Sequence, residues 1–216
     1  MPPELFPLFS ASFVTFFVLI DALGVAPIFA TLTAQGDAAY RRRMAVKATI
    51  VAAIIIYAFA FGGAWLLAAM HISIDAFRAA GGVLLFLIAL DMVFEKRTER
   101  RESRAEGVMA EHDESDPPED ISVFPIGIPM IAGPGTIATA MFYMTDVDSV
   151  AEQAVVMAAL ALNLVLVLLI FLAAGPIVKA MGESVAGALT RIMGVILAAL
   201  SIQLLIDGVK GAFGLA

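Results

Sequence analysis

Long apolar stretches dominate the chain and predict helices that cross a membrane. Three of them, 48–70, 121–145 and 153–178, contain no Asp, Glu, Lys or Arg. A helix needs about 20 apolar residues to cross roughly 30 Å of hydrocarbon, so each stretch is long enough. The stretches are apolar on every face and do not alternate between polar and apolar residues. This pattern excludes the strands of a membrane barrel.

The same pattern predicts six membrane helices joined through one charged linker. Residues 95–120 form this linker, which is basic in its first half and acidic in its second. We expect it to bury no core of its own and to be mobile in part. The chain therefore divides into a first repeat at 1–94, the linker, and a second repeat at 121–216. The predicted helices are Leu5 to Thr33, Met44 to Met70, Phe77 to Phe94, Ile121 to Thr145, Gln153 to Val178 and Val185 to Gly211.

Composition supports an integral membrane protein and argues against an enzyme. Hydrophobic residues make up 61% of the chain and charged residues 15%, which a soluble domain of this size cannot accommodate. The net charge of -7 arises mostly in the linker, so it indicates no nucleic-acid partner. There is no cysteine, and both histidines, His71 and His112, fall in predicted loops. Without any hydrolase motif, we expect no catalysis, no metal and no cofactor.

The distribution of Lys and Arg predicts the orientation in the membrane. If the loops after the first, third and fifth helices are cytoplasmic, eleven of the 13 basic residues lie inside, and only Arg78 and Lys210 lie outside. Both termini are then external and the linker is cytoplasmic. The N-terminus has no basic region and no cleavage site, so we expect the first helix to be retained.

The two halves of the chain resemble each other. The segments Phe77 to Asp91 and Thr190 to Asp207 share an Arg at the start, a Gly three residues later, an apolar run and a terminal Asp. Each half also begins with a helix that Gly and Pro interrupt. Because three helices per half is an odd number, the halves must cross the membrane in opposite senses. We predict an all-α integral membrane fold of two inverted three-helix repeats, with the first and fourth helices broken in mid-membrane.

The first break surrounds Asp21, an isolated carboxylate in an otherwise uncharged segment. Gly24 and Pro27 follow it, and the Pro27 ring should clash with the carbonyl group of Leu23 and unwind the helix there. A carboxylate at this depth needs a cavity or a partner, and beside an unwound turn it resembles a cation or amine site. The structural alternative is that Asp21 caps the following half-helix or pairs with a fixed arginine.

The second break lies in the fourth helix, where Gly-Pro-Gly leaves backbone groups without intrahelical partners. A half-helix that starts near Thr136 would present its N–H groups to an anion such as a substrate carboxylate. The two breaks occupy equivalent places in the halves, which is typical of a transporter binding site. A zwitterion such as an amino acid would satisfy both, whereas a pair of purely structural kinks is the alternative. The candidates at this break are Pro129, Gly133, Pro134, Gly135 and Thr136.

Other polar groups are weaker candidates for a site. Buried amides are expected to form hydrogen bonds between helices. Carboxylates near helix ends are accessible to water, and arginines there anchor at the membrane surface or pair with a carboxylate. These secondary candidates are Asn163, Gln203, Arg78, Arg191, Asp91 and Asp207.

Taken together, the motifs resemble the MarC family of bacterial inner-membrane proteins, which is itself similar to the lysine-exporter (LysE) superfamily. The resemblance rests on D-x-x-G-x-x-P-x-F from Asp21, RAAGG in the third helix, the proline and Gly-Pro-Gly pattern of the fourth, and T-R-x-M-G in the sixth. Ala22 and Val25 depart from the family's usual pattern, which has Pro and Asn there. The resemblance implies a multi-pass protein of the bacterial cytoplasmic membrane and suggests transport.

We therefore predict a small-molecule transporter or exporter with an unassigned substrate, embedded in the lipid bilayer and able to work as a homodimer. A channel would conduct without saturating, whereas a carrier should saturate. An accessory protein that does not transport would instead bind a stable partner through the linker.

Overall fold

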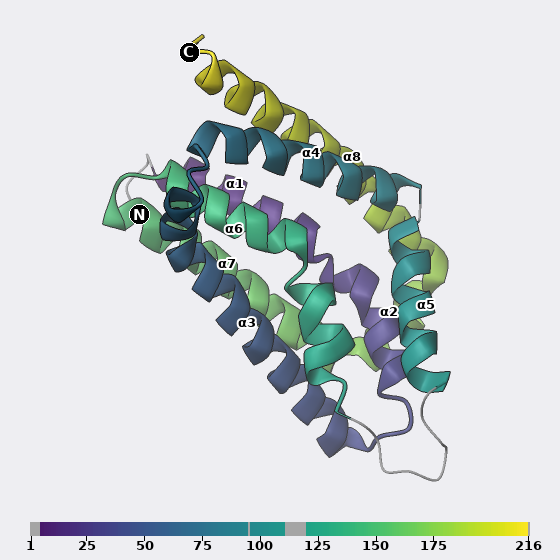
Figure 1. The fold of residues 1–216 in the computed structure, drawn as a ribbon. Coiled ribbons are helices and arrows are strands. Elements are labelled where there is room, and N and C mark those ends of the chain that lie inside the picture. The colour runs from purple at the N-terminus through teal and green to yellow at the C-terminus, as the bar shows by residue number, and fades with distance from the viewer. Residues whose placement is uncertain (1–4, 95, 111–119, 216) are drawn as a thin grey trace.

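The structure is a computed structural model that describes residues 5–94, 96–110 and 120–215. Every regular element within these ranges is helical. Figure 1 shows α4 and α8 side by side along one edge, and α5 turned across the end of the bundle. The elements are α1 (Leu5–Ile20), α2 (Ala22–Leu32), α3 (Ala38–Ala69), α4 (Ile74–Val93), α5 (Lys96–Ala110), η1 (Ser122–Ile131), α6 (Pro134–Asp146), α7 (Val150–Leu172) and α8 (Ala174–Ala212).

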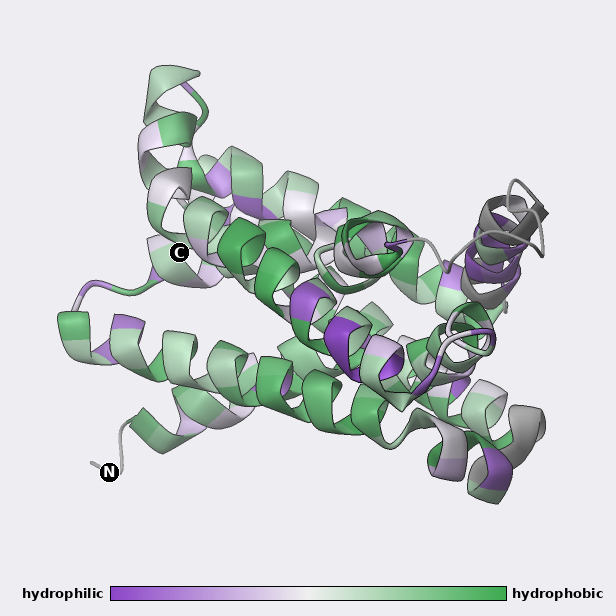
Figure 2. Ribbon diagram, turned by 90° about the horizontal axis from the view of Figure 1, so that it is seen from below, coloured by the Kyte–Doolittle hydropathy of each residue, from purple (hydrophilic) through white to green (hydrophobic). Residues whose placement is uncertain are grey.

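The helices are suited to a lipid environment. Within the described residues, five helical runs are long and apolar enough to cross a membrane, and the bent pair of η1 and α6 counts as a sixth if the two form one span. Figure 2 shows hydrophobic residues along most of the helices. Large apolar side chains such as Trp65, Phe61 and Val150 are exposed, which is costly in water and favourable against lipid tails. The chain is thus a multi-pass integral membrane protein, as its composition predicted.

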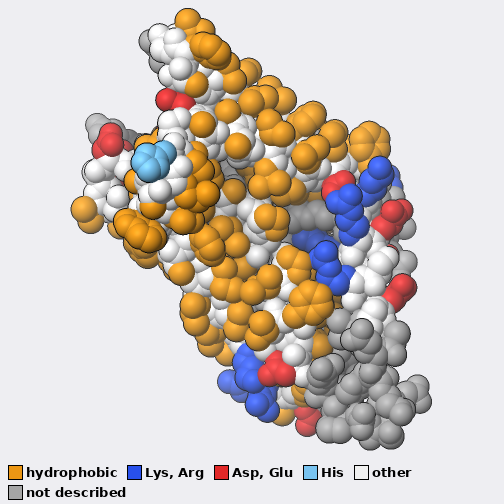
Figure 3. Space-filling model, in the orientation of Figure 1, with side chains coloured by type: hydrophobic (Ala, Val, Ile, Leu, Met, Phe, Trp, Pro, Cys, Tyr) orange, Lys and Arg blue, Asp and Glu red, His pale blue; other side chains and the backbone are white. Residues whose placement is uncertain are grey.

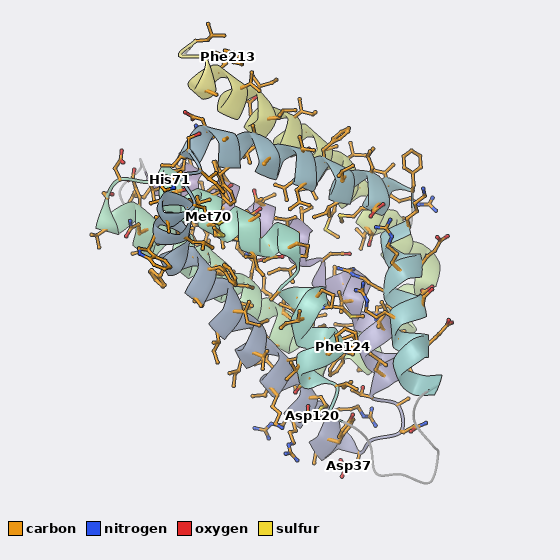
Figure 4. All side chains as sticks on the ribbon, viewed as in Figure 1. Asp37, Met70, His71, Asp120, Phe124 and Phe213 are labelled. Carbon is orange, nitrogen blue, oxygen red and sulfur yellow. The ribbon has the colours of Figure 1, made fainter. Side chains whose placement is uncertain are left out.

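The loops separate into two groups at opposite ends of the molecule. Figure 4 shows His71, which follows α3, and Phe213, which follows α8, toward one end. Asp37, which precedes α3, and Asp120, which precedes η1, lie toward the other. This separation agrees with helices that cross the membrane from one side to the other. The assignment of one side as cytoplasmic stays a prediction from the basic residues.

The first helical run is interrupted at a single residue, Asp21. Its backbone is left-handed, with φ 52° and ψ 52°, and α2 begins immediately after it. Aspartate tolerates this conformation because its side chain can form local hydrogen bonds. The expected unwinding at Leu23 is wrong, since Pro27 lies inside α2. The break therefore precedes the proline by six residues.

The prolines of the fourth segment prevent a regular helix before α6. Phe124 and Ile128, which precede Pro125 and Pro129, have extended backbones, as sterics before proline require. The axes of η1 and α6 form an angle of 56°. The half-helix starts at Pro134, two residues earlier than the sequence suggested.

Three predicted helix ends are shifted in the structure. The second helix begins at Ala38 because the Asp37 side chain caps it, accepting from the Tyr40 N–H at 2.7 Å. The fifth ends at Leu172 and not at Val178, because the Pro176 ring would collide with the Leu172 carbonyl group. Pro176 is tolerated in the first turn of α8, which therefore begins at Ala174 and continues through the predicted sixth helix.

The linker was expected to bury no core of its own, yet part of it packs into the core of the fold. Its residues Lys96–Ala110 form α5, which packs against α2 and α4. Arg101 and Ala105 of this helix are buried. Residues 111–119 of the linker lie outside the described ranges, so its predicted mobility is untested there.

Glycines bring α4 and α8 into close contact in a reciprocal pattern. A Cβ atom on Gly82 would lie 2.8 Å from the Ser201 carbonyl oxygen and 2.7 Å from the Leu205 nitrogen. One on Gly194 would lie 3.1 Å from the Ala89 carbonyl oxygen and 3.0 Å from Val93 Cγ2. Gly194, Ser201 and Leu205 each follow their counterparts Gly82, Ala89 and Val93 by 112 positions. Asp21 and Gly133, which directly precede the half-helices α2 and α6, are separated by the same interval.

Candidate functional site

A cavity of about 300 Å³ lies between the two halves and beside the linker helix. The first half contributes α1 and α4, the second half contributes η1 and the start of α6, and α5 closes one side. Figure 3 shows Lys and Arg side chains gathered around a hollow on the face toward the viewer. The lining residues are Leu19, Ile88, Asp91, Arg100, Arg101, Arg104, Pro129, Met130, Gly133, Pro134, Gly135 and Thr136.

The start of α6 presents uncapped backbone donors at this cavity. Gly133 precedes the helix and supplies no side chain to cap it, and Pro134 has no N–H. The first amide of the helix to bond is that of Ile137, which donates to the Gly133 carbonyl group at 3.0 Å. The amides of Gly135 and Thr136 have no acceptor among the described residues, although both residues are buried. Donors of this kind, at the positive end of a helix dipole, attract an anion.

Three arginines of α5 line the same cavity and differ in their burial and ion pairing. The Arg101 side chain is 6% exposed, and its Nη1 donates to Asp21 Oδ2 at 2.9 Å. Its Nη2 is buried and has no hydrogen-bond partner in the part of the chain that the structure describes. Arg100 pairs with Asp91, whereas Arg104 is exposed and has no ion-pair partner within the described ranges. The three arginines carry three positive charges, and their partners Asp21 and Asp91 carry two negative charges. The site therefore has a formal excess of one positive charge.

Asp21 is enclosed by protein groups rather than open to a ligand. It is 1% exposed and accepts from the Gly24 N–H at 3.2 Å and from Thr190 Oγ1 at 3.4 Å, in addition to Arg101. It therefore both caps α2 and pairs with an arginine, which are the two arrangements named as the structural alternative. Asp21, Gly24 and Pro27 do not line the cavity, whereas the five candidates of the second break all do.

The secondary candidates are divided between structural contacts and the cavity. Asn163 donates from α7 to the Phe13 carbonyl group of α1 at 3.1 Å, so it joins two helices as expected of a buried amide. Gln203 was expected to do the same, but it donates to Asp207 one turn away on its own helix. Of the carboxylates, only Asp91 reaches the cavity.

The two arginine candidates lie away from the cavity. Arg78 pairs with Asp146 at the end of α6 and stacks over the Phe142 ring at 5.4 Å. It thus links α4 to the second half by pairing with a carboxylate, one of the two expected roles. Arg191 is exposed on α8 and does not line the cavity.

Sequence reasoning missed the arginines of α5. The linker was treated as a solvated charge run, yet Arg97, Arg101 and Arg104 recur at the spacing of one helical face. That spacing could have predicted a basic helix face, although not its target. No cluster of three His, Cys, Asp or Glu side chains suited to a metal occurs within the described residues.

Comparison with known proteins places the chain in a family of integral membrane proteins. The family model described as a MarC family integral membrane protein matches residues 6–213. The UPF0056 membrane protein YvbG of Bacillus subtilis is 36% identical, and the match covers 93% of each chain. The UPF0056 membrane protein YhcE of Escherichia coli is 32% identical over 96% of this chain and 94% of its own. A UPF0056 membrane protein of the archaeon Methanocaldococcus jannaschii is 34% identical over 94% of this chain and 97% of its own. No solved structure matches the chain.

Proposed function

Because the chain belongs to the MarC family of integral membrane proteins, we propose that it is a small-molecule transporter of the cytoplasmic membrane. The observation that carries this proposal is the cavity of about 300 Å³ at the start of α6. This volume is at the lower end of the range for small-molecule sites. Both halves of the chain line it, which is the location expected of a substrate site in a transporter built from repeats.

The two interrupted segments support a carrier mechanism. Leu19, which lines the cavity, lies two residues before the break at Asp21, and Gly133 to Thr136 form the break of the second half. Irregular backbone inside a membrane is tolerated where it lines a cavity or is buried in protein. In this proposal, Pro129, Gly133, Pro134, Gly135 and Thr136 contact the substrate directly. Asp21 and Gly24 shape the first break, and the ion pair of Asp21 with Arg101 holds α5 against it.

The reciprocal contact between α4 and α8 supports the proposed inverted symmetry. Gly82 of α4 contacts Ser201 and Leu205 of α8, and Gly194 of α8 contacts Ala89 and Val93 of α4. The second set of residues consists of the counterparts of the first in the other half. Two related halves of this kind can rock against each other around a shared site. We propose that this movement opens the cavity alternately to the two sides, with both termini external and α5 cytoplasmic.

The proposal can be tested with a variant that fills the cavity. Ile88 lines the cavity, so Ile88→Trp should occlude it without changing any charge. Leu87→Trp is the matched control, because Leu87 is the preceding residue of α4 and is 56% exposed on the apolar surface. Metabolites would be compared in the medium and interior of cells that lack the protein or contain the wild type or either variant at equal membrane levels.

We expect at least one compound to change with the wild type and with Leu87→Trp but not with Ile88→Trp. Its flux into membrane vesicles should then saturate and show counter-exchange. Flux that grows linearly with concentration would indicate a channel instead. If no compound distinguishes Ile88→Trp from the wild type, and a partner protein copurifies with both, the accessory role replaces the transporter.

A further inference from the structure

The polar groups of the cavity point to one class of ligand. We infer that the cavity binds the carboxylate group of a small organic acid between the start of α6 and the arginines Arg101 and Arg104. The inference deepens the proposed transport function, on which its biological meaning rests. Its test is a binding measurement, which does not require transport.

The first contribution is the buried start of α6. This helix has 13 residues, and the amides of Gly135 and Thr136 are without acceptors among the described residues. Buried amides without partners are costly, and an oxyanion at this point would accept from them. Thr139, one turn further along the same face, also has a buried hydroxyl group without a hydrogen-bond partner among the described residues.

The second, independent contribution is Arg101. Its side chain is more than nine-tenths buried and reaches the cavity, but among the described residues only its Nη1 is bonded, to Asp21. Its Nη2 is the unpartnered donor of a charged group, which is costly to bury without an acceptor. A planar guanidinium held on one side by a carboxylate can offer its remaining donor to a second carboxylate. Asp21 is thus a positioning residue for Arg101 and does not itself contact the ligand.

The charge balance favours an anion over a cation. Both acidic residues near the cavity are already paired, Asp21 with Arg101 and Asp91 with Arg100. Arg104 adds a further positive charge at the rim and has no described ion-pair partner. A cationic ligand would meet these arginines and the positive end of α6 without a free carboxylate to offset them.

The rest of the lining suits the apolar body of an organic acid rather than an inorganic ion. Leu19, Ile88, Pro129 and Met130 form this part of the wall. A small acid could direct its carboxylate to the donors and its carbon atoms to these side chains. Inorganic phosphate has no such apolar part and would leave this surface uncovered.

The test measures binding to the purified full chain in detergent, in a buffer free of phosphate and organic acids. Calorimetric titrations would compare propionate with propionamide and alanine with alaninamide, because each pair differs in its carboxylate. Inorganic phosphate would be the remaining probe. We expect the carboxylate of at least one pair to bind and its amide not to bind.

The variants separate the site from general charge effects. Arg104→Gln should weaken carboxylate binding about tenfold or more, as expected for one lost charge-assisted contact. Arg42→Gln is the control, because Arg42 is an exposed basic residue of α3 that does not line the cavity. Since Arg101→Gln alone would leave Asp21 buried without its partner, the double variant Asp21→Asn with Arg101→Gln removes both charges. It should fold but lose carboxylate binding.

Equal binding of an acid and its amide, binding of phosphate alone, or no binding of any probe would overturn the inference. The same holds if Arg104→Gln binds the acid as tightly as Arg42→Gln does. Failure of the transport proposal is distinguishable: binding that depends on Arg104, with no flux in vesicles, leaves the anion site intact and removes the transporter. Flux that does not change when Arg101 or Arg104 is substituted would support the transporter and remove the anion site.

Discussion

Asp21 and Arg101 lie 80 positions apart in the sequence and form a buried ion pair of 2.9 Å. The pair joins the break between α1 and α2 to a helix in the linker between the two halves. Because α5 also walls the cavity, this contact couples the geometry of the first break to that of the proposed binding site. The linker helix α5 is therefore part of the packed structure.

Removal of Arg101 should be strongly destabilising. In Arg101→Ala the carboxylate of Asp21 remains buried without its charged partner, which typically costs about 3–5 kcal/mol. We expect a clear fall in the thermal unfolding temperature of the protein in detergent. Asp21→Asn combined with Arg101→Gln should recover part of the loss, because neither charge then remains. Arg104→Ala removes an exposed arginine of the same helix that has no described ion-pair partner, so this variant should unfold near the wild-type temperature. An equal fall there would contradict the buried pair.

A methyl group at Gly24 should disrupt the same contact from the other side. A Cβ atom on Gly24 would lie 2.4 Å from Asp21 Oδ2, the oxygen that binds Arg101. The carboxylate would have to move away from the arginine, so we expect Gly24→Ala to lower the free energy of unfolding by about 1–3 kcal/mol.

Gly62→Ala is the matched control for Gly24→Ala. Nothing lies within 4 Å of the position of its Cβ atom, and alanine favours a helix by about 1 kcal/mol over glycine. Chemical denaturation of both variants in the same detergent would measure the difference. Equal stability of the two variants would show that the Asp21 carboxylate can relax without cost.

The sequence predicted the membrane class and the long apolar segments, because these depend on local composition. The first interruption was expected at Leu23, whereas α2 begins directly after Asp21. The Gly-Pro-Gly segment before α6 was identified from its composition. The partner of Asp21 was not, because Arg101 comes from a charged linker whose docking depends on contacts across the fold. Apolar periodicity shows which residues avoid water. It does not show which two charged residues form a buried ion pair.

The boundary between α7 and α8 shows a related limit. Apolar composition continues without interruption from Gln153 to Val178, so hydropathy alone placed the end of the helix too late. The position is decided by one steric contact, between the Pro176 ring and the carbonyl group of Leu172. The same proline rule failed at Pro27, where the helix continues and the break lies at Asp21.

Neighbouring glycines of α4 should respond differently to the same substitution. A Cβ atom on Gly82 would meet backbone atoms of α8, which cannot rotate away, at 2.7 and 2.8 Å. On Gly81 it would meet only Leu204 Cδ2 at 3.8 Å, an ordinary contact. We expect Gly82→Ala to lower the unfolding free energy by about 1–3 kcal/mol and Gly81→Ala to leave it nearly unchanged. If Gly81→Ala proved the more damaging variant in denaturation experiments, the register of α4 on α8 would be wrong.

The ion pair between Lys47 and Asp120 should make stability depend on pH in a defined range. The Lys47 ammonium group and then the Ser122 hydroxyl group lower the pKa of Asp120 to about 2. A carboxylate whose pKa is lower in the folded than in the unfolded protein stabilises the fold above the unfolded value, near 4. The contribution is therefore complete above about pH 4 and is lost as the pH falls toward 2. Because both side chains are at least 40% exposed, it should amount to less than about 1 kcal/mol.

Lys47→Gln isolates this contribution from all other titrating groups. The variant should unfold at a slightly lower temperature than the wild type at pH 7, and the difference should diminish as the pH falls below about 4. Thermal unfolding of both proteins in the same detergent across this range would measure it. Arg42→Gln removes a positive charge from the same end of α3 but not the ion-pair partner of Asp120. The difference in unfolding temperature between this variant and the wild type should therefore not change as Asp120 titrates. A Lys47→Gln difference that stayed constant down to pH 2 would mean that Asp120 does not depend on Lys47 for its ionisation.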